Sequence, residues 1–411
     1  MPTAAPVPRG PSLLLLGSAA GLLDRPGCPA CRYAAEASDA YLTWFALDGH
    51  YDADVLSLVC ASRGMCPLHS RRLLSQPGAA TRLTSVYRYV IEVAMRDLCA
   101  RPARCPACEH DEAAADRVID ILLEDVMAED RTAYEQHGGL CLPHLRRAAS
   151  RSRAADLRWA LRFMTKRLTR ELPSLELLAG WPDHDAASRA ALRAGLPARP
   201  TQNEPRTCSA CWAAAIAERE KLSGTCSAGG RTPPSFPVDC LCERHLYDAA
   251  AAVDYSASVV LSWQAACHAA RLNQILDTHP RRLGISVGRL SARSRRALAS
   301  PDCPICQRRD AAGSHEVRRL QARLRPGRMW PGDESGLCVR HLNTLQALDA
   351  QAGRLAADRV SEYASQLVDE LAAAFDMQTW ARRGDPKGAE MTAWRRAAAF
   401  LDGAVLGGCP A

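Results

Sequence analysis

Apolar residues recur at helical spacing along most of the chain, and Pro and Gly separate the segments in which they do. In residues 82–99 the recurring positions are Val86, Val90, Val93 and Leu98. The same spacing is found in three later segments, which are 145–172, 253–276 and 341–375. Because a period of about 3.6 residues is typical of amphipathic helices, we expect an all-α protein.

A stretch of different character divides the chain. Residues 181–205 contain Pro182, Pro197, Pro200 and Pro205 among polar residues, which is typical of a linker. We therefore expect two pairs of helical modules on either side of it. The expected boundaries are 1–180 for the N-terminal pair (1–100 and 101–180) and 206–411 for the C-terminal pair (206–300 and 301–411).

Each expected module contains a Cys-x-x-Cys followed by a Cys-x-x-His. The intervening lengths are 34, 32, 30 and 31 residues in the four copies. Three thiolates and one imidazole are a ligand set of closed, four-coordinate zinc sites, which stabilise a fold without activating water. The candidate metal ligands are Cys28, Cys31, Cys66 and His69; Cys105, Cys108, Cys141 and His144; Cys208, Cys211, Cys242 and His245; and Cys303, Cys306, Cys338 and His341.

The spacing also suggests how the ligands combine. From each His to the first Cys of the next copy the intervening lengths are 35, 63 and 57 residues, so only the length inside a copy is nearly constant. We therefore predict that each copy closes its own site, with an exchange of ligands left open only between the first two copies. This predicts up to four zinc ions per chain, with iron–sulfur centres as a minor alternative.

The third copy departs from the others because Cys240 stands where the remaining copies have Gly. Either Cys240 or Cys242 is therefore a candidate for its third ligand. Six cysteines lie outside the repeated pattern and share no spacing, namely Cys60, Cys99, Cys226, Cys240, Cys267 and Cys409. Thiolate ligands persist in a reducing compartment, so we expect a cytoplasmic protein.

Composition supports a stabilising role for metal. Hydrophobic residues make up 47% of the chain but aromatic residues only 5%, and much of the apolar content is Ala, so packing alone buries little area per residue. No apolar run approaches the length of a membrane span. The net charge of +7 is carried almost entirely by Arg and does not by itself identify a polyanionic partner.

Two basic segments are candidates for contact with nucleic acid. Arg158, Arg162, Lys166 and Arg170 stand four residues apart, and residues 281–296 form a connector rich in Arg. A basic helix face in contact with solvent alone is the simpler interpretation of each.

The phrases Gly139-Leu140-Cys141-Leu142-Pro143-His144-Leu145 and Gly336-Leu337-Cys338-Val339-Arg340-His341-Leu342 resemble a bacterial family without an assigned activity. That family is built from repeated Cys-Pro-x-Cys and Gly-x-Cys-x-x-His-Leu modules. The resemblance covers the four motif regions and implies a helical, zinc-binding architecture and no reaction.

The sequence contains no phosphate-binding loop, no dinucleotide fingerprint, no nucleophile elbow and no His-Glu-x-x-His. An enzyme is therefore not the favoured class. The leading hypothesis is a zinc-stabilised helical scaffold that binds a partner, with a protein as the first candidate and nucleic acid as the second. The alternatives are a thiol redox sensor that releases zinc on oxidation and an iron–sulfur electron-transfer protein.

Overall fold

The structure is a computed structural model. It describes residues 19–23, 25, 27–74, 76, 78–98, 100, 102–125, 131–136, 139–151, 154–170, 177–178, 180, 208–227, 241–242, 245–246, 248–249, 257–278, 303–324, 336–382 and 384–402. Every regular element in these residues is a helix, which confirms the all-α prediction.

The helices of the N-terminal half are α1 (Ala19–Leu22), α2 (Pro29–Leu47), η2 (Gly49–Tyr51), α3 (Ala53–Ala61), α4 (Pro67–Leu74), α5 (Ala79–Arg96), α6 (Pro106–Asp125), α7 (Arg131–Gln136), α8 (Leu142–Arg151) and α9 (Ala154–Arg170). Those of the C-terminal half are α12 (Ser209–Ser227), α14 (Ala257–Thr278), α16 (Pro304–Arg323), α17 (Val339–Leu348), α18 (Ala350–Asp376), η4 (Trp380–Arg382), η5 (Ala389–Thr392) and α19 (Ala393–Asp402).

The segment 341–375, predicted as one helical run, is divided between α17 and α18 at Asp349. Asp349 has extended backbone angles, with φ −154° and ψ 105°. Its carboxylate accepts hydrogen bonds from the backbone N–H groups of Gln351 and Ala352, so it caps the N-terminus of α18. The apolar period alone does not reveal this break because the pattern continues on both sides of it.

Each described Cys-x-x-Cys lies at the start of a long helix. Cys28 and Cys303 have extended backbone angles and precede Pro29 and Pro304, the first residues of α2 and α16. Proline is favoured at this position because its fixed φ suits the helix and the first N–H groups need no helical partner. The second Cys of each motif follows one turn later, so both thiols face the same side.

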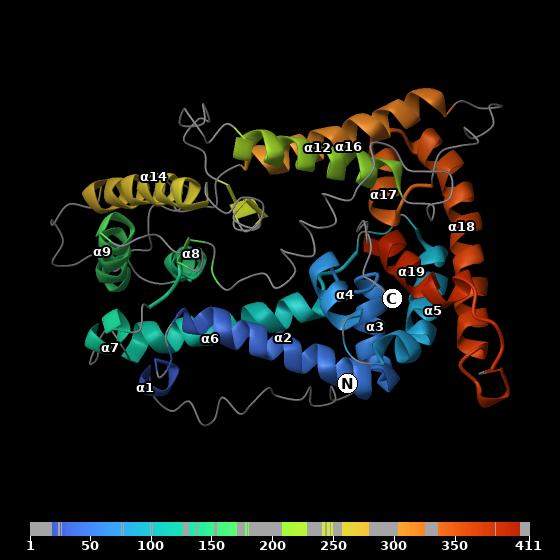
Figure 1. Ribbon diagram of the computed structural model, residues 1–411, viewed down its shortest axis with the longest axis horizontal. Coiled ribbons are helices and arrows are strands. Elements are labelled where there is room, and N and C mark those ends of the chain that lie inside the picture. The colour runs from blue at the N-terminus through green and yellow to red at the C-terminus, as the bar shows by residue number, and fades with distance from the viewer. Residues whose placement is uncertain are drawn as a thin grey trace.

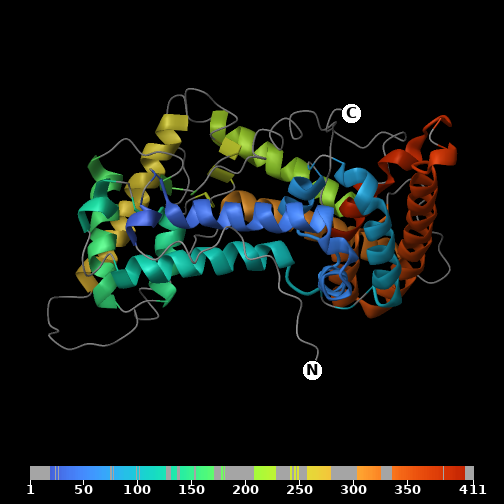
Figure 2. The ribbon, with the colours of Figure 1, turned by 90° about the horizontal axis from the view of Figure 1, so that it is seen from below.

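Two pairs of long antiparallel helices form the frame of the molecule. In Figure 1, α2 lies beside α6 and α12 lies beside α16, and Figure 2 shows the same neighbours from below. The antiparallel direction follows from Tyr41, near the end of α2, whose ring stacks on that of His110, near the start of α6, with centroids 4.4 Å apart.

The two halves of the chain pack against each other reciprocally. Helix α5 of the first half packs on α18 of the second, and α14 of the second half packs on α9 of the first (Figure 1). One hydrophobic core includes Leu83, Ile91, Leu367 and Leu371. The other core includes Leu157, Leu161, Leu272 and Ile275. This exchange is the pattern that a two-fold symmetric dimer of one module pair would have.

Both cores therefore draw residues from both sides of the expected linker, and the domain boundaries stay a prediction. The linker itself, 181–205, lies outside the described residues. Among the helices that the structure describes, none combines the length and the apolar character needed to cross a lipid bilayer.

Candidate metal centres

The sixteen predicted ligands gather into four compact groups of three Cys and one His. Cluster A is Cys28, Cys31, Cys141 and His144; cluster B is Cys66, His69, Cys105 and Cys108; cluster C is Cys208, Cys211, Cys338 and His341; and cluster D is Cys242, His245, Cys303 and Cys306. Within each cluster the candidate ligand atoms all lie within 4.8 Å of one another.

The prediction that each copy closes its own site is wrong. In both halves, a cluster combines the Cys-x-x-Cys of one copy with the Cys-x-x-His of its neighbour. The spacing leaves an exchange open only between the first two copies, whereas in the structure it also occurs between the third and fourth.

Helix geometry explains the exchange. Helix α2 has 19 residues, so it carries the chain about 28 Å away from Cys28 and Cys31 before the chain turns back. Cys66 and His69 therefore arrive at the far end of α2, where the antiparallel α6 begins with Cys105 and Cys108. The nearly constant spacing within a copy thus reflects the length of a helix pair.

Distances within the clusters are short and similar. The sulfur atoms of Cys31 and Cys141 are 3.5 Å apart in cluster A, and those of Cys66 and Cys108 are 3.6 Å apart in cluster B. The corresponding sulfur–sulfur distances are 3.7 Å in cluster C and 3.6 Å in cluster D. None of the twelve cluster cysteines forms a disulfide, so these contacts are between separate sulfur atoms.

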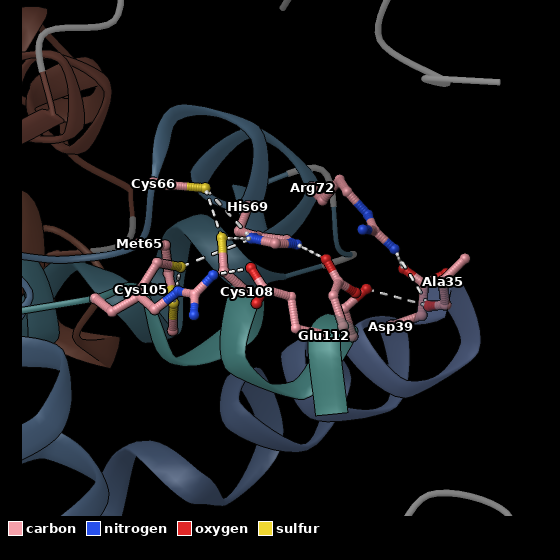
Figure 3. Close-up of polar contacts among 12 residues, drawn as sticks. Ala35, Asp39, Met65, Cys66, His69, Arg72, Cys105, Cys108 and Glu112 are labelled. Carbon is pink, nitrogen blue, oxygen red and sulfur yellow. Dashed lines mark hydrogen bonds and ion pairs between the residues drawn. The ribbon is translucent and has the colours of Figure 1, made fainter. Parts of the chain in front are cut away.

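In every cluster the His presents Nδ1 to the thiols. In cluster B, Nδ1 of His69 lies 3.3 Å from Cys66, 3.7 Å from Cys105 and 3.4 Å from Cys108. Figure 3 shows this arrangement, with the three sulfur atoms on one side of the imidazole. In clusters A, C and D the same nitrogen–sulfur distances range from 3.2 Å to 3.5 Å.

These distances fit one tetrahedral ion per cluster. A zinc ion with sulfur ligands at about 2.3 Å and a nitrogen ligand at about 2.0–2.1 Å places its sulfur atoms about 3.8 Å apart and the nitrogen about 3.6 Å from each sulfur. The sulfur–sulfur distances in the four clusters, 3.5–3.7 Å, are close to that value. The donor atoms therefore already have the spacing that a single four-coordinate ion requires.

The thiols of one cluster cannot all ionise easily without a cation. The pKa of Cys105 is lowered because hydrogen bonds from Cys108 and Cys66 stabilise its thiolate. The same contacts raise the pKa of Cys108, which holds its proton beside two sulfur atoms. In cluster D the pKa of Cys303 is lowered and that of Cys242 is raised for the same reason. A bound dication would favour the ionised form of all three thiols.

A carboxylate supports the imidazole in two of the clusters. Asp111 Oδ2 lies 3.0 Å from Nε2 of His69, and Glu218 Oε1 lies 2.6 Å from Nε2 of His245. Burial opposes protonation of His69, but its hydrogen bonds to Asp111, Cys105 and Cys66 outweigh that effect and raise its pKa to about 11. Such carboxylates fix the ring orientation and strengthen the nitrogen as a ligand.

Sequence reasoning missed both carboxylates. Asp111 follows Cys108 on the same helix, so helical spacing could have suggested it. Glu218 lies on α12, whose cysteines Cys208 and Cys211 belong to cluster C, while the His it supports belongs to cluster D. No local pattern connects Glu218 to His245. The buried Asp248 lies in the same group as these two residues.

Two glycines are required by the backbone close to cluster A. Gly139 has a φ of +59°, and a Cβ added there would lie 2.1 Å from the ring of Tyr134. Tyr134 in turn accepts a hydrogen bond from the backbone N–H of Leu140 and so holds the segment that leads to Cys141. Gly180 has a φ of +87°, and a Cβ there would lie 3.2 Å from the sulfur of Cys31.

The remaining predicted residues are placed as follows. Cys242 takes part in cluster D, and Cys240 lies outside the described residues. Of the other extra cysteines, Cys60 and Cys267 are buried, form no disulfide and belong to none of the four clusters. On α9, Arg158 is half-buried, and Arg162, Lys166 and Arg170 are exposed. The basic connector 281–296 lies outside the described residues.

Comparisons with known proteins add no family. The chain matches no family model, and neither a curated protein nor a solved structure matches it. The resemblance of the motif regions to a bacterial module family stays a prediction.

Proposed function

We propose that this protein is a zinc-stabilised helical scaffold that binds a macromolecular partner. The observation that supports it best is the set of four Cys3His clusters, each of which joins two segments far apart in the chain. Cluster C, for example, brings Cys211 next to Cys338, 127 residues further on. A metal ion at each cluster would hold the ends of the antiparallel helix pairs together.

The donor set favours zinc and a structural role. Four protein ligands leave no open position for water or substrate, so a tetrahedral ion here would stabilise the fold without performing a reaction. The sulfur–sulfur distances of 3.5–3.7 Å suit one ion per cluster. Ions at both ends of a helix pair would compensate for cores that are rich in Ala and poor in aromatic residues.

Exposed apolar residues support a protein as the first candidate partner. Tyr51 is 81% exposed, Leu58 56% and Leu47 48%, and they follow one another from the end of α2 to α3. Large apolar side chains concentrated in a short exposed segment are typical of surfaces that contact other proteins.

Metal analysis tests the scaffold function. Protein purified without added metal should contain four zinc ions per chain by native mass spectrometry and elemental analysis. Removal of the metal by a strong chelator should lower the helical content and the melting temperature, and returned zinc should restore both. Purified protein with no metal and unchanged melting would contradict the proposal. Iron with acid-labile sulfide would instead support the electron-transfer alternative.

A further inference from the structure

Helix α9 has a buried face and a basic face. Leu157, Leu161, Met164 and Leu168 are buried in the second core. On the opposite side, Arg162, Lys166 and Arg170 are exposed and stand four residues apart, so they form a stripe along successive turns. The stripe is about 12 Å long, and half-buried Arg158 stands one turn before it.

The charges of the three exposed cations are not matched by acidic side chains within the described part of the chain. Arg162, Lys166 and Arg170 take part in none of the ion pairs found there, whereas exposed arginines elsewhere do, as Arg88 does with Glu92 at 2.9 Å. Three neighbouring cations with open surroundings favour a polyanion with repeated charges over a single anion.

A pair of aromatic rings lies beside the stripe. Trp159 and Phe163 are half-buried, one turn apart, and their rings are nearly parallel, with centroids 5.9 Å apart and an interplanar angle of 6°. Tyr134 supports both rings edge-on from the core, at centroid distances of 5.1 Å and 5.7 Å. The rings are therefore held in a fixed orientation.

The faces of these rings accept planar cationic groups. The guanidinium of Arg131 lies 5.6 Å from the centroid of Trp159, and that of Arg167 lies 5.9 Å from the centroid of Phe163. A planar group can thus reach each ring. Arginines beside exposed rings are common where bases stack, because both the ring and the guanidinium present a flat face.

We infer that this surface, defined by Trp159, Arg162, Phe163, Lys166 and Arg170, binds single-stranded nucleic acid. The cationic stripe would contact successive phosphates, and Trp159 and Phe163 would stack on unpaired bases. A duplex buries its base faces between neighbouring bases, so the two rings could not stack on them. The inference rests on the scaffold function, because α9 follows α8, whose first turn carries His144 of cluster A.

The test measures binding of fluorescent 12-nucleotide oligo-U and oligo-dT over a salt series, with a duplex of equal length and a polyglutamate competitor. Three exposed cations predict a slope of log K against log salt of about −2 for single strands. A triple variant with Arg162→Gln, Lys166→Gln and Arg170→Gln should bring that slope close to zero. The matched control carries Arg318→Gln, Arg340→Gln and Arg354→Gln, three exposed arginines on α16, α17 and α18, and should bind like the original protein.

Stacking is tested separately. Trp159→Leu should weaken single-strand binding by at least about 5-fold without changing the salt slope, and Trp159→Phe should restore most of the affinity. Zinc content and helical content are measured for every variant. If they are unchanged while binding is lost, the loss belongs to the surface and not to the scaffold.

The two proposals fail differently. Absence of metal in a protein that still binds oligonucleotide through Trp159 would overturn the scaffold function alone. The nucleic-acid surface would be overturned if neither oligonucleotide bound at low salt, or if the two triple variants lost equal affinity. It would also be overturned if the duplex bound more tightly than the single strand. The same holds if polyglutamate bound as tightly as the oligonucleotides and Trp159→Leu left that binding unchanged. A preference for oligo-U over oligo-dT, or the reverse, identifies RNA or DNA as the source of the strand.

Discussion

The interleaved clusters make a prediction about which cysteines lose metal together. Cys31 and Cys141 belong to cluster A, with sulfur atoms 3.5 Å apart, whereas Cys66 belongs to cluster B. The double variant Cys31→Ser with Cys141→Ser should therefore keep three metal ions. The double variant Cys31→Ser with Cys66→Ser should keep at most two. Sites closed within each copy predict the opposite result.

The expected change in stability follows from the length of chain that cluster A closes. Cys31 and Cys141 are 110 residues apart. A cross-link over that distance removes unfolded-state entropy worth about 4.8 kcal/mol, on the scale used for disulfides. Opening cluster A should thus lower the free energy of unfolding by about 5 kcal/mol. A second change within the same cluster should add little, while one in cluster B should add a comparable loss.

Native mass spectrometry gives the metal count, and urea denaturation gives the free energy of unfolding. Because a protein with two opened clusters can unfold, a second measurement uses the single variant Cys31→Ser. Under native conditions an alkylating reagent should modify Cys28 and Cys141, and Cys66 should stay protected by cluster B. Modification of Cys66 together with Cys28, while Cys141 stays protected, would refute the interleaved arrangement.

Three further predictions concern single positions. Glu218→Gln should weaken metal binding at cluster D by about 10- to 100-fold in a chelator competition, and Glu220→Gln on the exposed side of the same helix should not. Gly139→Ala should lower the free energy of unfolding by at least about 2 kcal/mol in urea denaturation, because Gly139 has a positive φ and the added Cβ would meet the ring of Tyr134. The control Gly336→Ala should be nearly neutral, because no atom lies within 4 Å of the added Cβ. Burial and neighbouring arginines lower the pKa of His268 to about 3, so the folded protein keeps this imidazole neutral down to about that pH. The unfolded chain takes up the proton at about pH 6.5, so the stability that is present above pH 6.5 is lost as the pH falls from there toward 3. His268→Gln should flatten the pH dependence of unfolding in that window by up to about 1.4 kcal/mol per pH unit, and an unchanged slope would contradict the assignment.

The sequence was sufficient for the all-α class and for recognising the residues that gather into the four clusters. Cys-x-x-Cys and Cys-x-x-His place two donors on one helical turn, so residues such as Cys28 and Cys31 could be recognised locally. Their partners could not, since a spacing of about thirty residues fits a closed loop as well as a long helix followed by a return. Choosing between Cys66 and Cys141 requires knowing that α2 and α6 are antiparallel, which is a tertiary fact.

The same limit explains what else the sequence did not reveal. The apolar period of α9 identifies its buried face, but it does not say that α14, from the other half of the chain, covers that face. Glu218 looked like one of several charged residues on α12 until the structure placed it against His245. Trp159 and Phe163 fall outside the apolar period of α9, and only the structure shows that Tyr134 of α7 supports both rings.

Anomalous diffraction at the zinc absorption edge, from crystals of protein purified without added metal, would show directly which residues hold each ion. Four peaks are expected, one in each cluster, with the peak at cluster A about 2.3 Å from the sulfur atoms of Cys28, Cys31 and Cys141 and about 2.0–2.1 Å from Nδ1 of His144. A peak bound by Cys28, Cys31, Cys66 and His69, or crystals without anomalous density at the clusters, would contradict the interleaved zinc sites.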